Sequence, residues 1–134
     1  MGQYGAMIAD ASTVGLRYAK RLLVGLPADR YARFATPGNH VVESNHPAFI
    51  LGHLSLYPAK VLTLLGLDAA AVQPPDEYST LFSKDAKCVD DPDHAIYPTL
   101  EELSGVFIHV YEQAIAAIRN ASDEQLAVEN PVDT

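Results

Sequence analysis

Five histidines are the residues of this sequence best suited to bind a metal or to move a proton near neutral pH: His40, His46, His53, His94 and His109. No two of them have the spacing of the His-Glu-x-x-His motif, which places two zinc ligands on one helix face. His53 is the candidate metal ligand, because its neighbours place it on the inward face of a long helix, where an imidazole needs a hydrogen-bond partner or a metal. The alternative is a core histidine bonded to a hydroxyl such as that of Tyr57 or Ser55.

Two other histidines are expected to have no role in chemistry. His46 directly precedes Pro47 at the predicted start of the same helix, so we expect it to cap that helix. His109 lies far from the apolar stripe of its own helix, and we expect it on the surface. The metal prediction therefore depends on His53 alone.

Oxygen ligands for a hard cation could come from one acidic segment, which contains Asp90, Asp91, Asp93 and His94. The segment lacks the glycine and the final glutamate of an EF-hand loop, and Pro92 interrupts it, which favours solvated acids in a turn. Cys88 has no second cysteine to pair with, so an internal disulfide is excluded. Without an adjacent base to activate its thiol, we expect Cys88 to be a small, buried or half-buried apolar side chain.

Three segments repeat apolar residues with a 3.6-residue period, which predicts three long amphipathic helices. The stripes contain Ile8, Ala11, Gly15, Tyr18 and Leu22 in the first segment, Ile50, His53, Tyr57, Val61 and Leu64 in the second, and Leu103, Phe107, Val110, Ala114, Ala117 and Ala121 in the third. No run alternates strictly between apolar and polar residues, so we expect an all-α protein.

The second helix is predicted to begin near Pro47, which suits a first turn, and to end at Gly66. Pro58 lies inside it and removes one backbone donor from the carbonyl of Leu54. We therefore expect a kink directly beside His53, with a polar group released toward the interior.

Thr99 and Glu102 match the capping box that opens a helix, and Ser122 is expected to begin a further short helical turn. Residues 67–98 contain Pro74, Pro75 and Pro92 among many turn-forming residues and show no clear period. Because a long structureless connection is uncommon in a compact domain, we expect this segment to form an ordered flap.

The chain has 134 residues, of which 49% are apolar, and this fits a single domain over residues 1–134. Three long helices with short helical turns predict an up-down four-helix bundle that lacks its C-terminal helix. Since the chain ends at Thr134, we expect either a truncated bundle or a partner chain that covers the open seam.

The net charge of −8 disfavours nucleic acids and anionic membranes as partners, because both attract basic surfaces. No apolar stretch reaches the roughly 20 residues that a membrane-spanning helix needs. The first residues also lack the basic start of a secretory signal, so we expect a cytoplasmic protein.

Residues 45–54 (NHPAFILGHL) resemble the second-helix motif N-x-P-x-W/F-x-x-G-H-L of the DinB/YfiT-like superfamily of bacterial four-helix proteins. Residues 88–92 (CVDDP) and 97–103 (YPTLEEL) are similar to the segment that leads into the third helix of that family. The resemblance spans roughly residues 40–105, and the first helix is compatible with it.

The resemblance implies a bundle that holds a divalent metal, commonly nickel or zinc, through three histidines. His53 occupies the position of the first ligand, whereas the other two belong to a fourth helix with no counterpart in these residues. Because a transition-metal site takes three protein ligands plus an open position, we expect this chain to bind metal weakly or not at all.

Characterised members of the family are transferases or isomerases that use a low-molecular-weight thiol, such as mycothiol, bacillithiol or glutathione, on a small-molecule substrate. The metal would activate the thiol, and the flap at residues 67–98 would cover the pocket. The first functional hypothesis is therefore a metal-dependent, thiol-using protein of this type, forming a homodimer.

The second hypothesis is a helical interaction or dimerisation module without catalytic activity. It predicts that the open seam of the incomplete bundle is covered by a second chain through Leu103, Phe107 and Val110.

Overall fold

The computed structural model describes residues 2–130, so Thr134, on which the expectation of a truncated chain depends, lies outside the described residues. The α-helices are α1 (Gln3–Leu23), α2 (Pro47–Leu54), α3 (Tyr57–Leu64), α4 (Glu77–Phe82), α5 (Leu100–Asn120) and α6 (Asp123–Leu126), with 3-10 turns η1 (Pro37–Asn39) and η2 (Ala70–Val72). Over residues 2–130 there is no β-strand, only an isolated bridge between Ala35 and Val42, which confirms the all-α prediction. None of the helices over these residues is long and apolar enough to cross a membrane.

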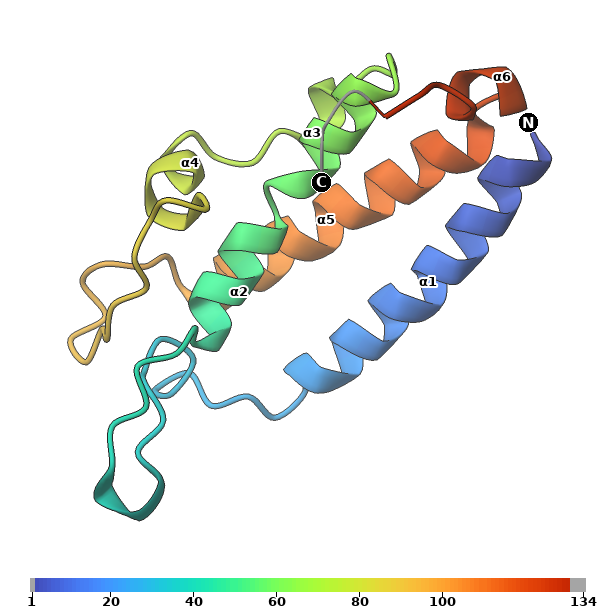
Figure 1. Cartoon of the computed structure of the whole chain (residues 1–134). Helices are drawn as coiled ribbons and strands as arrows, with labels where there is room; N and C mark the ends of the chain where they lie inside the picture. Colours follow the sequence, from blue (N-terminus) through green and yellow to red (C-terminus); the bar gives the residue numbers. More distant parts are fainter. Residues whose placement is uncertain (1, 131–134) are drawn as a thin grey trace.

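Helix α5 lies at the centre of the arrangement, with α1 on one side and the pair α2 and α3 on the other (Figure 1). α1 is antiparallel to α5, and the backbone N–H of Gly2 donates to the carbonyl of Ala121 at 3.0 Å. α2 and α3 run in the same direction as α5 (Figure 1), so residues 65–99 form a crossover connection between parallel neighbours.

A close approach of backbones holds α1 against α5. The residues of α1 buried in this contact are Gly5, Ala9 and Leu16. A Cβ atom on Gly5 would overlap with the backbone carbonyl of Ile118 in α5, so only glycine fits there. Small residues on this face of α1 therefore set how closely the two helices pack.

The apolar stripe that marks this helix in the sequence is not the face packed against α5. Ile8, Tyr18 and Leu22 are 44%, 61% and 64% exposed, and Ala11 and Gly15 are exposed too. α1 therefore has two apolar faces, of which the more hydrophobic one is not covered by its own chain.

The stripe predicted for α5 is confirmed as buried, since Leu103, Phe107 and Val110 are at most 6% exposed. The prediction that these side chains form a dimer seam is wrong for Leu103 and Val110, because other residues of the same chain already bury them. The Thr99 hydroxyl accepts from the backbone N–H of Glu102 at 3.1 Å, as the capping box predicts. The capping box also predicts that the Glu102 carboxylate accepts from the backbone N–H of Thr99. This carboxylate instead accepts a hydrogen bond from the hydroxyl of Tyr78.

Residues 67–98 contain η2, which packs against α3 and α5, and α4, which packs against α2. Val72, Tyr78 and Phe82 are at most 1% exposed, and α4 contacts α2. Ser122 begins the predicted short turn with a complete capping box, in which its hydroxyl and backbone N–H bond with Gln125.

The predicted kink at Pro58 is confirmed as a break between α2 and α3. Pro58 has no N–H to give to the carbonyl of Leu54, and the hydroxyl of Tyr111 in α5 donates to that carbonyl instead, at 2.9 Å. The released carbonyl thus becomes a point of attachment between α2 and α5.

We predict that Tyr111→Phe lowers the free energy of unfolding by about 1 kcal/mol, because it removes the donor to the Leu54 carbonyl. In a Pro58→Ala background the loss should be smaller, since the new backbone N–H at position 58 can take over that carbonyl. Urea denaturation of the four members of this double-mutant cycle, followed by circular dichroism, measures the coupling. Equal losses in both backgrounds would contradict the assignment.

Candidate functional site

His53 lies half-buried in α2 with both ring nitrogens in hydrogen bonds. Nδ1 lies 2.7 Å from the backbone carbonyl of Phe82, and because a carbonyl only accepts, Nδ1 carries the proton. Nε2 is then the acceptor for the Tyr57 hydroxyl at 3.1 Å. The expected hydroxyl partner is thus confirmed for Tyr57, whereas Ser55 donates to the carbonyl of Leu51.

The orientation of this ring follows from the way α4 docks on α2. A Cβ atom at Gly52 would overlap with the ring of Phe82, which is fully buried. The His53 ring stacks on Phe49, with 6.0 Å between ring centroids. The adjacent Gly52 and His53 therefore both serve the Phe82 contact, one by making room and the other by binding the Phe82 carbonyl.

A metal site needs more ligands than this region provides. A proton on Nδ1 held by a carbonyl is the usual arrangement of a metal-binding histidine, which coordinates through Nε2. Among residues 2–130, however, no three side chains of histidine, cysteine, aspartate or glutamate lie close enough to hold an ion. The described residues do not by themselves fit a divalent metal.

The other histidines have structural or exposed positions. His46 is the predicted cap: its Nδ1 accepts from the backbone N–H of Phe49 at 3.2 Å, and its Nε2 donates to the carbonyl of Val89 at 2.8 Å. His109 is exposed, as predicted. His40 and His94 are exposed as well.

The acidic segment organises a loop and leaves few oxygens for a cation. Asp91 is 1% exposed and accepts hydrogen bonds from three backbone N–H groups, those of Ala95, Ile96 and Tyr97. The prediction of solvated acids is therefore wrong for Asp91, although Asp93 is exposed.

Asp90 and Cys88 have partners of their own. The carboxylate of Asp90 binds the guanidinium of Arg33 at 2.9 Å and the backbone N–H of Phe34, and these bonds hold its pKa below the ordinary value. Cys88 is half-buried, as predicted, and burial raises the pKa of its thiol. A low fraction of thiolate disfavours Cys88 as a nucleophile.

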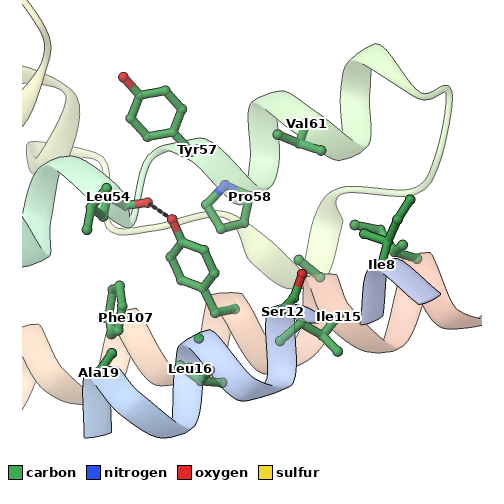
Figure 2. Close-up of a pocket in the computed structure, with 14 residues that line it drawn as sticks. Ile8, Ser12, Leu16, Ala19, Leu54, Tyr57, Pro58, Val61, Phe107 and Ile115 are labelled. Atoms are coloured by element: carbon green, nitrogen blue, oxygen red, sulfur yellow. Dashed lines mark hydrogen bonds between the residues drawn. The ribbon is translucent and has the colours of Figure 1, made fainter. Parts of the chain in front are cut away.

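An apolar groove runs between α1 and the α2 and α3 pair, with α5 as its floor (Figure 2). Its volume is about 550 Å³, and none of the residues that line it is charged. The lining residues are Ile8, Ser12, Gly15, Leu16 and Ala19 of α1, Leu54, Tyr57, Pro58 and Val61 of the α2 and α3 region, and Phe107, Tyr111, Ala114, Ile115 and Ile118 of α5.

Some of the exposed apolar residues of the first two stripes line this groove. Ile8, Tyr57 and Val61 all line it and are 44%, 41% and 41% exposed. Sequence analysis found these stripes but not the groove between them. The signal that points to it is the second apolar face of α1, which is visible only once Gly5, Ala9 and Leu16 are known to face α5.

We predict that Asp91→Asn lowers the free energy of unfolding at pH 7 by about 1–3 kcal/mol, because an amide oxygen replaces a carboxylate that accepts three N–H donors. Burial raises the pKa of Asp91, but the three donors outweigh burial and the net pKa is lowered. A lowered folded-state pKa gives stability that is present above about pH 4 and is lost as the pH falls through the folded value.

Urea denaturation at pH 7 and pH 3 should therefore show a smaller pH dependence for Asp91→Asn than for the wild type. Asp93→Asn, at an exposed neighbour, is the control and should retain the wild-type dependence. An unchanged pH dependence in Asp91→Asn would contradict this role of the carboxylate.

Comparison with protein-family models, with curated proteins and with solved structures finds no match for this chain. The resemblance to the DinB/YfiT-like superfamily therefore rests on residues 45–54, 88–92 and 97–103 alone.

Proposed function

We propose that this chain is a helical interaction module whose groove binds an apolar helix. The observation that carries the proposal is the groove itself: two helical walls and a floor, all uncharged, open to solvent along one side of the bundle. The groove has a volume of about 550 Å³ and is lined by residues of α1, α3 and α5. Isolated apolar side chains are common on surfaces, but a continuous apolar surface of this kind is typical of a site where another element docks.

The shape of the groove supports a helix as the occupant. In a four-helix bundle each helix packs against two neighbours, and the groove lies where a fourth helix would contact both α1 and α3. The four-helix architecture is thus completed by the docked helix in this proposal.

We predict that Val61→Glu, which puts a charge on the groove wall, strongly reduces binding of the neutral apolar dye Nile red. Fluorescence titration of the dye at low protein concentration measures the effect, and the loss should be about tenfold or more in affinity. The matched control is Val24→Glu, because Val24 is 82% exposed and does not line the groove. Equal dye binding by both variants would contradict the groove as the site.

As a second candidate function, we propose a DinB-like protein that binds divalent nickel or zinc, with His53 as one ligand. Two observations support it: the Phe82 carbonyl holds the proton on Nδ1, and Nε2 faces the hydroxyl of Tyr57, which is 41% exposed. A metal could replace this single hydroxyl without disturbing the Phe82 contact. The remaining ligands, the thiol and the small-molecule substrate would have to come from outside the described residues.

We predict that Zn²⁺ binds this chain weakly and at His53 first, because one oriented imidazole cannot make a complete site. NMR of the histidine side chains during a Zn²⁺ titration should show the Nε2 resonance of His53 shifting before that of the exposed His109. His53→Gln should abolish this first step, and His109→Gln should leave it intact. If the His53 resonance shifts last, or if the first binding step in His53→Gln has the wild-type affinity, the ligand assignment is wrong.

A further inference from the structure

We propose that the helix that docks in the groove is α1 of a second copy of this chain, in an antiparallel, two-fold symmetric dimer. The proposal rests on the docking function above and names its partner. Since α1 is itself one wall of the groove, one symmetric contact places α1 of each copy in the groove of the other and fills both grooves.

The first argument is that α1 exposes an apolar face to solvent. It is 21 residues long, which corresponds to about 30 Å and matches the length of a bundle helix. Its uncovered apolar side chains, each between 44% and 65% exposed, are Tyr4, Met7, Ile8, Val14, Tyr18 and Leu22. A foreign helix would cover the groove but leave most of this face in water, whereas a second copy can cover both.

The second argument is Gly15, a glycine in the middle of α1 that its own chain does not require. A Cβ atom there would meet no atom within 4 Å, and the residue is helical rather than left-handed. Such a glycine costs about 0.5–1 kcal/mol of helix stability relative to alanine. Together with Ser12 and Ala19 on the same wall, Gly15 gives a second helix backbone room to approach closely.

The third argument is charge, which also selects the orientation. The chain has a net charge of −8, so two copies repel each other over most of their surface. The groove is uncharged, and two of the four charged side chains of α1, Asp10 and Lys20, form ion pairs with α5 of the same chain, which leaves Arg17 and Arg21 for contacts between copies. An antiparallel pair keeps Arg17 and Arg21 of the two copies apart, whereas a parallel pair would place these bases together.

Sedimentation equilibrium of the full chain tests the proposal, with Gly15→Leu as the disrupting variant. The open space around Gly15 lets the monomer accept leucine. The midpoint temperature of monomer unfolding, followed by circular dichroism, should therefore not be lowered. In the dimer the added side chain occupies the helix crossing, and the dimer dissociation constant should rise by about tenfold or more. Gly105→Leu is the matched control, because Gly105 is an exposed helical glycine of α5 with no atom near its Cβ position and lies outside the groove.

The expected result is a wild-type dimer that Gly15→Leu weakens and Gly105→Leu does not. A dimer that both variants retain, or that both weaken equally, overturns the placement of α1 in the groove. A wild-type monomer whose groove still binds Nile red overturns the second copy as partner but leaves the docking function standing. A wild-type monomer that binds no dye overturns both proposals.

Discussion

The central constraint on this structure is that α5 needs apolar cover on more than one side, and the described chain leaves the side between α1 and α3 uncovered. α1 packs on one flank through its small residues, and α2 and α3 pack on the other. Neither flank reaches around to the other, so the groove stays open between them. The exposed apolar faces of α1 and α3 are thus two sides of one uncovered position in the bundle.

The break at Pro58 connects this constraint to His53. In an unbroken helix the backbone N–H of residue 58 would donate to the Leu54 carbonyl. Because Pro58 has no N–H, the hydroxyl of Tyr111 on the floor of the groove donates to that carbonyl instead. The same break separates α2, which holds His53 against Phe82, from α3, which forms the wall at Val61. A single residue, Pro58, therefore links the packing of α4, the hydrogen bond to α5 and the shape of the groove.

Local signals in the sequence predicted local structure well. The cap at His46, the hydroxyl half of the Thr99 cap and the break at Pro58 each depend on residues a few positions apart, and all three are present. The face that α1 buries could not be predicted, because periodicity identifies the most apolar stripe, and the contact with α5 is made through small side chains instead. Asp91 was missed for a related reason: its three donors come from a loop whose path no periodic pattern describes.

Docking in the groove would also change the surroundings of His53. Tyr57 lines the groove and donates to Nε2, so a helix that covers Tyr57 removes water from the one polar partner of that nitrogen. A hydrogen bond shielded from water is stronger, and an unpaired nitrogen there is costlier. The docked helix must therefore either preserve the bond between Tyr57 and His53 or supply a new group to Nε2. Ser12 on the wall of the groove and the exposed Tyr4 and Tyr18 of α1 offer hydroxyls, so a second copy of α1 could replace the Tyr57 hydroxyl at Nε2 only with another hydroxyl.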